Sequence, residues 1–139
     1  MSQIIIRYFD SRHPYLRNGC HRFVAIDAAD AFNIIGSVAL ESATDEWGWI
    51  NDLWVDPDCF RRGIGRQLVD EAERVAHDLG VKGTCCGIHP DNKPSRALFE
   101  SKGYQHVYSY PDTGSLLFSR TFQTGDILRI ADTEGSLWA

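Results

Sequence analysis

The sequence lacks the features that place a chain in a membrane or on nucleic acid. No apolar run approaches the roughly 20 residues that a membrane-spanning helix needs. Basic residues are few, because 14 lysines and arginines stand against 19 aspartates and glutamates, for a formal net charge of −5. This balance argues against a general nucleic-acid or anionic-membrane surface and is compatible with a cationic substrate. We therefore expect a small-molecule or peptide partner, and neither nucleic acid nor membrane.

The cysteines have no metal-binding spacing, since no two of them form a C-x-x-C pair. The four are Cys20, Cys59, Cys85 and Cys86. We expect reduced thiols, as is usual in the cytosol, and hence a cytoplasmic protein without a metal site. Residues 1–7 contain neither a basic segment nor a long apolar one, which argues against a signal peptide.

Several familiar enzyme motifs are also missing. Gly63 and Gly65 are not followed by the third glycine of G-x-G-x-x-G, because Leu68 stands there. The sequence contains no G-x-x-x-x-G-K, H-E-x-x-H or G-x-S-x-G. These absences disfavour a dinucleotide-binding domain, a P-loop NTPase, a zinc protease and a serine hydrolase. The five histidines are scattered, and only His89, at the end of a predicted strand, is a candidate for a functional role.

What stands out instead is residues 55–66, V-D-P-D-C-F-R-R-G-I-G-R, between a strand-like run and an amphipathic run at 66–79. A glycine turn that opens a helix presents backbone N–H groups without internal partners, and the helix dipole favours negative charge there. Three arginines crowd this acid-favouring end of an acidic chain: Arg61, Arg62 and Arg66. A bound polyanion would explain why basic residues stand where the helix dipole favours acidic ones, and a solvated basic turn is the alternative.

Hydrophobic periodicity predicts an α/β (α+β) fold. The predicted strands are 4–9, 21–27, 34–41, 46–55, 81–88, 104–110 and 115–122, and the predicted helices are 66–79 and 95–102. Gly36 is expected at a bulge or a close approach, and Gly80 is expected to end the first helix in the left-handed conformation. Strand, helix and strand in this order predict a right-handed crossover with parallel strands inside an otherwise antiparallel sheet.

The whole chain, residues 1–139, is expected to form a single domain. In open sheets, ligands enter beyond the carboxyl ends of parallel strands, which places the site where the fourth and fifth strands part. The tail, residues 123–139, is expected to add a short strand or to contact another subunit.

Two blocks together resemble the GNAT N-acetyltransferase superfamily. Residues 50–57 and 62–69, INDLWVDP and RGIGRQLV, are similar to its acetyl-CoA motif, R/Q-x-x-G-x-G/A. Residues 92–104, NKPSRALFESKGY, are similar to its N-x-x-(A/S)-x-x-L-Y-E-x-x-G-F block. Order, spacing and structural context match over about residues 34–122, which implies a GNAT-like sheet that splays to admit acetyl-CoA.

The resemblance implies a role for each matching residue. Backbone groups of one set would pair with the pantetheine arm: Leu53, Trp54 and Val55. Backbone N–H groups of a second set would hold the pyrophosphate, with the arginines near the adenosine phosphates: Arg61, Arg62, Gly63, Ile64, Gly65 and Arg66. Asn92 and Ser95 would touch the pantetheine or the thioester. Acetyl-CoA is then the co-substrate, without a metal.

The sequence departs from the family pattern at three places. Phe60 replaces the usual Gln or Arg, which matters little to a cradle built from backbone groups. Phe99 replaces a Tyr that protonates the departing thiolate in many members, so Tyr104, a water molecule or the solvent-exposed thiolate itself are the alternatives. Residues 10–19 are shorter than the pair of helices that commonly covers the acceptor. An open acceptor cleft, or one completed in a homodimer, is therefore expected.

The proton acceptor is less clearly marked. The family often has an acid at the places of Trp49 or Asn51, and neither is acidic here. We expect Asp52 as the base with Asn51 positioning a water, provided that a bulge re-aims Asp52, since strict alternation sends it to the opposite face. Glu41 and Glu46 are further candidates.

Two aromatic residues on the fourth strand, Trp47 and Trp49, share the parity of Asn51 and are expected to line the acceptor side, where they suit a cationic or aromatic amine. Ordinary sheet packing is the alternative. The function implied by the resemblance is acetyl-CoA-dependent N-acetylation of a primary amine, on a small molecule or a peptide, by direct attack. A CoA-binding module with little or no catalysis is the alternative.

Overall fold

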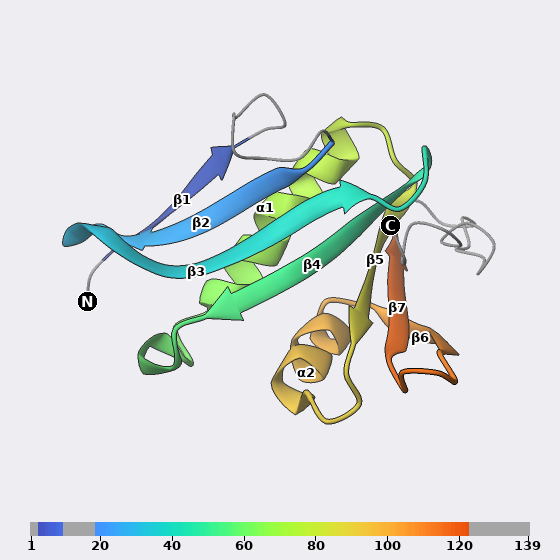
Figure 1. Cartoon of the computed structure of the whole chain (residues 1–139). Helices are drawn as coiled ribbons and strands as arrows, with labels where there is room; N and C mark the ends of the chain where they lie inside the picture. The colour runs from blue at the N-terminus through green and yellow to red at the C-terminus, as the bar shows by residue number, and fades with distance from the viewer. Residues whose placement is uncertain (1–2, 10–18, 123–139) are drawn as a thin grey trace. The chain divides into compact units, whose positions relative to one another are not determined.

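A computed structural model describes residues 3–9 and 19–122 (Figure 1). Its strands are β1 (Ile4–Phe9), β2 (His21–Asp27), β3 (Asp30–Ser42), β4 (Trp47–Val55), β5 (Gly83–Ile88), β6 (Gln105–Ser109) and β7 (Leu116–Thr121). Its helices are α1 (Ile64–Asp78), α2 (Lys93–Ser101) and the short 3-10 turn η1 (Pro57–Cys59).

The strands are hydrogen-bonded in the order β1-β2-β3-β4-β5-β7-β6. The pairs β1–β2, β2–β3, β5–β7 and β6–β7 are antiparallel. β4 and β5, on either side of α1 in the sequence, are parallel. The predicted α/β class, with a mostly antiparallel sheet and one parallel β-α-β crossover, is therefore confirmed.

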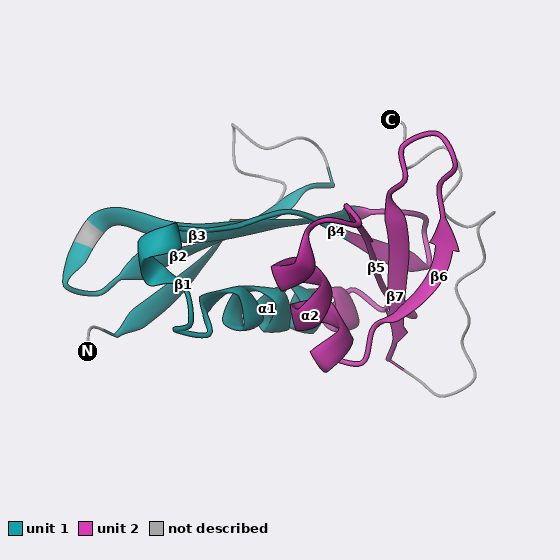
Figure 2. Cartoon of the chain, turned by 90° about the horizontal axis from the view of Figure 1, so that it is seen from below, with its two compact units in different colours: residues 1–41, 50–75 teal, residues 42–49, 76–139 magenta. Residues whose placement is uncertain are grey.

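The chain divides into two compact units (Figure 2). The first unit contains residues 1–41 and 50–75, and the second contains residues 42–49 and 76–139. β4 contributes residues to both units. Whether the chain behaves as a single domain stays a prediction, and each unit is described by itself.

In the first unit, α1 lies along one face of β1–β3 (Figure 2). Gly36 marks this face, because a Cβ atom added there would lie 3.1 Å from Leu68 Cδ1 and 3.2 Å from Ile64 Cγ2, both on α1. Phe23 and Ala25 of β2 are fully buried. They pair with Val38 and Gly36 of β3. Residues that alternate with them, such as Arg22, therefore point to the face opposite α1.

The close approach predicted at Gly36 is present. An added Cβ atom would also lie 2.9 Å from the backbone oxygen of Trp54. The register between β2 and β3 shifts beside it, since Ala25 pairs with Gly36 but Ile26 pairs with Ile34. Ile35 is the extra residue of this bulge, and its backbone oxygen accepts a hydrogen bond from Asp56 N–H at 2.8 Å.

In the second unit, β5 lies between the start of β4 and β7. Its first four residues are buried, as predicted for a strand covered on both faces. One face carries a buried cluster of Ala43, Trp47, Cys85 and Leu117. The other face carries Phe118, whose ring lies 5.9 Å from the Arg96 guanidinium of α2.

Most predicted boundaries lie within two residues of the observed ones, and β3 is the exception. The region 28–33 was expected to be a turn, but β3 already begins at Asp30 and the hairpin loop is only Ala28 and Ala29. The Asp27 carboxylate closes this loop by accepting a hydrogen bond from Ala29 N–H at 2.9 Å. A side-chain acceptor thus replaces the Gly or Asn that such short turns usually need.

Residues 10–18 and the tail 123–139, for which an open loop and an extra strand or subunit contact are expected, lie outside the described residues. Within the described ranges, no helix combines the length and the apolar character needed to cross a membrane. Gly80 follows α1 with a φ of +85°, which confirms the predicted left-handed helix end.

Replacing Gly36 by alanine should destabilise the protein. The new Cβ atom meets a backbone oxygen that cannot move without shifting β4, so we expect a loss of about 1–3 kcal/mol in the free energy of unfolding. The matched control is Gly87→Ala, also inside a strand, where the nearest atom would be Trp49 Cη2 at 3.4 Å. That variant should be unchanged or up to about 1 kcal/mol more stable. Urea titrations of both variants measure the difference, and equal stabilities would contradict the close approach.

Candidate functional site

The chain leaves β4 through a short, internally braced turn. Asp56 caps η1, since its Oδ1 accepts a hydrogen bond from Asp58 N–H at 3.0 Å. Pro57 occupies the first position of η1, where its fixed φ is suitable. Phe60 N–H then donates to Pro57 O at 3.2 Å. These bonds hold the five residues between β4 and Arg61 in one compact turn.

Residues 61–65 lead from this turn into α1 through two left-handed backbone positions. Arg61 and Gly63 have φ values of +69° and +75°, so left-handed residues flank Arg62. Gly63 O accepts a hydrogen bond from Gln67 N–H at 3.1 Å, which starts α1. Within the part of the chain that the structure describes, the N–H groups of Gly63, Ile64 and Gly65 donate to no acceptor. We call residues 61–65 the nest, because unpaired N–H groups at a helix N-terminus are suited to bind an anion.

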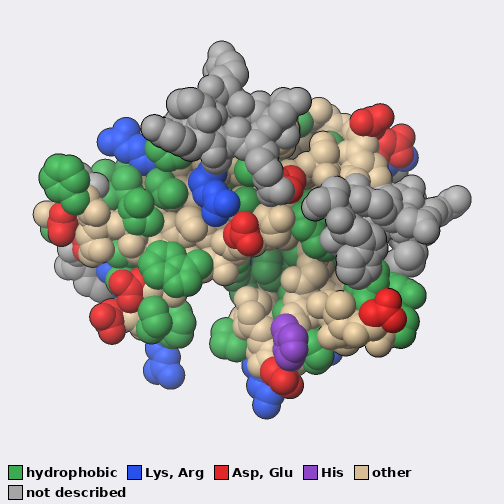
Figure 3. Space-filling model, in the orientation of Figure 1, with side chains coloured by type: hydrophobic (Ala, Val, Ile, Leu, Met, Phe, Trp, Pro, Cys, Tyr) green, Lys and Arg blue, Asp and Glu red, His purple; other side chains and the backbone are tan. Residues whose placement is uncertain are grey.

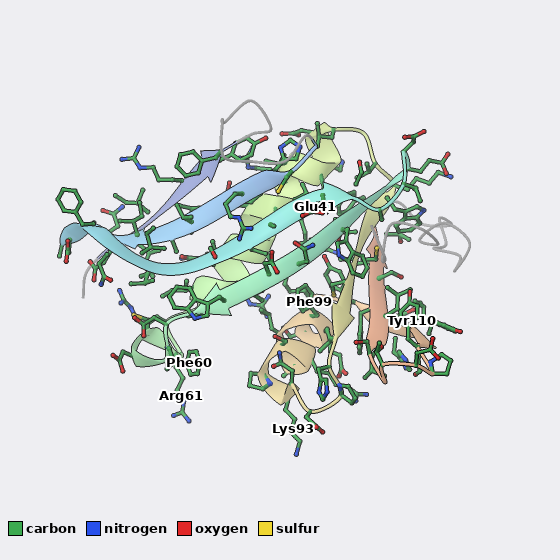
Figure 4. All side chains as sticks on the ribbon, in the orientation of Figure 1. Glu41, Phe60, Arg61, Lys93, Phe99 and Tyr110 are labelled. Carbon is green, nitrogen blue, oxygen red and sulfur yellow. The ribbon has the colours of Figure 1, made fainter. Side chains whose placement is uncertain are left out.

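The arginines around this nest differ in their roles. Arg62 is half-buried, and its Nη1 donates to Cys59 Sγ at 3.8 Å, so part of its function is to brace the turn. Arg61 and Arg66 are exposed. Figure 4 shows Phe60 and Arg61 projecting away from the strands of the first unit. Phe60 is 57% exposed, which leaves its ring available beside the nest.

β4 carries the second unusual backbone position. Asp52 has a φ of +54°, and its Oδ2 lies 3.5 Å from Nη2 of Arg22. Because Arg22 points to the face opposite α1, the Asp52 carboxylate does so too. Ile50 is only 2% exposed and belongs to the core, so alternation turns Asn51 to that same face. The left-handed residue thus supplies the re-aiming that a catalytic Asp52 requires.

Asn51 has an unsatisfied acceptor. Its Oδ1 is buried and has no hydrogen-bond partner in the described structure. A buried amide oxygen without a donor costs about 1–3 kcal/mol, and a bound donor would recover that cost. The Asn51 side chain and the exposed Asp52 carboxylate therefore lie on the same face of the first unit, with the Asn51 oxygen beneath the surface.

The other predicted acids are placed less favourably. Glu46 is 60% exposed and pairs with Lys82, with Oε2 and Nζ 3.4 Å apart. Glu41 is half-buried at the end of β3 (Figure 4).

His89 is 62% exposed, and its Nδ1 accepts a hydrogen bond from Asp91 N–H. In the described ranges, no three histidine, cysteine or acidic side chains gather into a metal-binding group.

In the second unit, Asn92 caps α2. Its Oδ1 accepts a hydrogen bond from Ser95 N–H at 3.3 Å, and Pro94 lies in the first turn. Asn92 and Lys93 are exposed, and Ser95 is half-exposed. The capping bond uses the Asn92 oxygen and leaves its amide N–H groups for a ligand. This arrangement is compatible with a pantetheine contact of Asn92 and Ser95, which stays a prediction.

Phe99 and Tyr104 both belong to the core of the second unit. They are each 3% exposed, and their rings meet edge to face with centroids 4.9 Å apart. The Tyr104 hydroxyl is hydrogen-bonded to Thr84 Oγ1, which is also buried. Tyr104 is therefore a poor substitute for the missing acid, because its hydroxyl is already engaged inside the protein.

One aromatic prediction needs correction. Trp47 is 1% exposed and fills the buried cluster, so its ring does not line an acceptor surface. Trp49 is half-buried on that cluster together with Tyr108 and Tyr110, whose rings meet edge to face at 4.9 Å. Sequence reasoning missed both tyrosines, although their i,i+2 spacing on a predicted strand placed them on one face.

The cysteines are free, as expected. Cys85 is buried and donates its thiol to Gly48 O at 3.4 Å. Burial raises the pKa of the Cys85 thiol far above its ordinary value. Cys85 therefore stays protonated and is unsuited to be a nucleophile.

On the face shown in Figure 3, lysine and arginine side chains lie singly among apolar and acidic ones and do not form one large basic area. On this face the distribution of charge suits a compact anionic group better than a long polyanion.

Comparisons with known proteins agree with this geometry. Residues 3–104 match the family model described as the acetyltransferase (GNAT) family. The chain therefore belongs to the GNAT family and is an acyltransferase.

Individual relatives are more distant. Over 59 residues, the chain is 36% identical to YwnH of Bacillus subtilis, a candidate phosphinothricin acetyltransferase. That match covers 42% of this chain and 36% of the relative, so it spans only about a third of that protein.

Solved structures share the fold. A candidate acyl-CoA N-acyltransferase of Klebsiella pneumoniae has a TM-score of 0.75 at 13% identity, over 86% of this chain and 98% of that one. NAA60 of Arabidopsis thaliana in complex with acetyl-CoA has a TM-score of 0.72 at 16% identity, over 86% and 99%. At these identities the likeness establishes the fold alone.

The left-handed conformation of Arg61 predicts an unusual response to glycine. Glycine at this position should relieve about 1–2 kcal/mol of steric strain in the folded state. It should also lower the free energy of unfolding by about 0.4–1 kcal/mol, because the unfolded chain becomes more flexible. Arg61→Gly should therefore be as stable as the parent or slightly more stable. Arg62→Gly, the neighbouring control, relieves no such strain and should be less stable. Thermal unfolding compares the two variants, and an equal loss in both would contradict the left-handed assignment.

Proposed function

We propose that this protein transfers the acetyl group of acetyl-CoA to a primary amine, on a small molecule or a peptide, by direct attack. The observation that carries this proposal is the nest at residues 61–65, where three unpaired N–H groups and exposed arginines follow directly after β4. This arrangement suits a pyrophosphate, which spreads negative charge over several oxygens. The amine, a homodimer and a cytoplasmic location remain predictions.

The donor would be held by backbone and arginine groups of the first unit. N–H groups of residues 61–66 would bind the pyrophosphate, with Arg61 and Arg66 adding charge. Residues 53–55, at the end of β4, would offer backbone groups to the pantetheine arm as an added strand does. In the second unit, Asn92 and Ser95 would contact the pantetheine or the thioester.

The reaction removes two protons from the acceptor nitrogen, which starts as an ammonium, and returns one proton to the departing thiolate. Asp52, or a water held by Asn51, would take a proton from the ammonium of the acceptor. The neutral amine nitrogen would then attack the thioester carbonyl carbon, with backbone N–H groups of β4 stabilising the developing oxyanion. The C–S bond breaks, an amide forms, the nitrogen loses its second proton to solvent, and the CoA thiolate leaves.

Protonation of the thiolate would not need a protein acid. Phe99 has no hydroxyl, and the Tyr104 hydroxyl is bonded to Thr84 in the core. A thiol pKa near 8.5 makes the thiolate an adequate leaving group, which water can protonate. The absence of a placed acid is also the observation that favours the second candidate, a CoA-binding module with little catalysis.

Steady-state release of free CoA across a panel of amines separates the two candidates. The enzyme should release CoA at a rate that depends on the acceptor and saturates with it. Saturable binding of acetyl-CoA without acceptor-dependent release would identify a binding module and reject the enzyme proposal.

Gly63→Glu should weaken acetyl-CoA binding. A carboxylate beside the unpaired N–H groups would repel the pyrophosphate, and we expect at least about a tenfold loss of affinity by calorimetry. Gly63→Ala is the matched control, because it adds the same strain at a φ of +75° without the charge, in a position with open space around the Cβ atom. Equal affinities of the two variants would contradict the placement of the pyrophosphate.

Asp52→Asn should slow the transfer without weakening donor binding. Asparagine tolerates the left-handed conformation as aspartate does, so the variant changes mainly the charge. We expect kcat/KM for the amine to fall by about 10²–10⁴-fold, with acetyl-CoA affinity within about twofold of the parent. Asp70→Asn, an exposed carboxylate on α1, serves as the control. Full activity of Asp52→Asn would exclude Asp52 as the base.

A further inference from the structure

Arg22 extends across the sheet toward the proposed catalytic carboxylate. It lies on β2, opposite Ala39 of β3, and its guanidinium reaches Asp52 on β4. A residue as small as Ala39 leaves room for the long Arg22 side chain to cross the intervening strand. Arg22, Ala39 and Asp52 all belong to the first unit, and they lie on the face opposite α1.

The contact between Arg22 and Asp52 is loose. Its single hydrogen bond is 3.5 Å long, at the outer limit for such bonds. The chain also contains two tight ion pairs for comparison, Arg74–Glu71 at 2.9 Å and Arg96–Glu100 at 2.7 Å. Those pairs have the length expected of charge-assisted hydrogen bonds, and the Arg22 pair does not.

The guanidinium therefore has unused donors. The Arg22 side chain is 29% exposed, and its only hydrogen bond within the described residues is the one to Asp52. A guanidinium has five N–H donors in a planar fork that matches a carboxylate or a phosphate. A partly desolvated cation with so few partners gains more from a bound anion than a fully solvated surface arginine does.

We propose that the acceptor is a zwitterionic amine of the amino-acid type, and that Arg22 binds its anionic group. This inference rests on the proposed function. The ammonium would contact the exposed Asp52 carboxylate, while the anion would take the free donors of Arg22. The four charges then alternate in sign, so each cation faces an anion. On a chain with net charge −5, a local cation is needed to hold an anionic substrate.

The test uses three acceptors that differ only in the anionic group. The common amino acids are screened first, and the best acceptor is then compared with its carboxamide and with its decarboxylated amine. kcat/KM is measured for each compound with the parent, with Arg22→Gln and with Arg74→Gln. Arg74 is the matched control, because it is an ion-paired arginine of the same unit on α1.

We expect the parent to prefer the amino acid over both analogues by at least about tenfold. Arg22→Gln should lower kcat/KM for the amino acid by about 10–100-fold, the value of one lost charge-assisted pair, and should leave the two analogues unchanged. Arg74→Gln should change none of the three. If Arg22 only positions Asp52, Arg22→Gln would lower kcat/KM equally for all three compounds, and this result would overturn the proposal. The proposal would also be overturned if Arg22→Gln kept the parent's preference for the amino acid.

A binding measurement keeps the inference separate from the proposed function. Calorimetry of the amino acid and of its decarboxylated amine, on the protein saturated with CoA, reports recognition without turnover. Preferential binding of the amino acid that is lost in Arg22→Gln supports the inference even if no amine releases CoA. Equal binding of the two compounds overturns it, whatever the enzyme assay gives.

Discussion

The close approach of β3 to the end of β4 is the constraint on which the candidate site depends. At Gly36 the missing side chain admits the Trp54 carbonyl and two side chains of α1 into one small volume. The neighbouring Ile35 carbonyl then receives the N–H of Asp56, the first residue after β4. These contacts fix where the chain leaves the sheet and where α1 begins. The contacts at Gly36 and Ile35 therefore also determine where the nest lies, because the nest connects the end of β4 to the first turn of α1.

Two non-glycine residues in the left-handed region distinguish the site from the rest of the fold. Asp52 and Arg61 are the only such residues in the described ranges, and each lies where a ligand group is expected. Left-handed backbone at such residues costs of order 1–3 kcal/mol each and persists where the surrounding structure enforces it. At Arg61 it gathers N–H groups, and at Asp52 it turns a carboxylate to the face opposite α1. Backbone strain and proposed chemistry thus coincide twice.

Much of the fold could be predicted because its signals are local or are carried by long periodic segments. The apolar face of α1, the glycines at 63 and 80 and the proline in α2 each predict the observed element at about the observed place. The start of β3 could not be predicted in this way, because the Asp27 side chain closes a loop that has no glycine. The left-handed conformation of Asp52 could not be predicted either, since aspartate occupies both extended and left-handed conformations.

Side-chain placement in the candidate site was harder to predict. Trp47 and Trp49 have the same parity, yet Trp47 is a fully buried member of the cluster, whereas Trp49 packs against it and is only half-buried. Tyr108 joins Trp49 through a register shift in the β6–β7 pair, which no local pattern reveals. The pairing of Arg22 with Asp52 joins residues thirty positions apart across β3. Such contacts follow from strand register, which a single sequence determines only weakly.

The uneven burial of the thiols has a practical consequence. Cys20, Cys85 and Cys86 are buried, and Cys59, in the turn that leads to the nest, is half-buried. A thiol-reactive fluorophore should therefore attach to the native protein mainly at Cys59. The chain carries its own labelling position next to the proposed pyrophosphate site. Occupancy of that site by nucleotide-like ligands can then be followed optically, without any engineered cysteine.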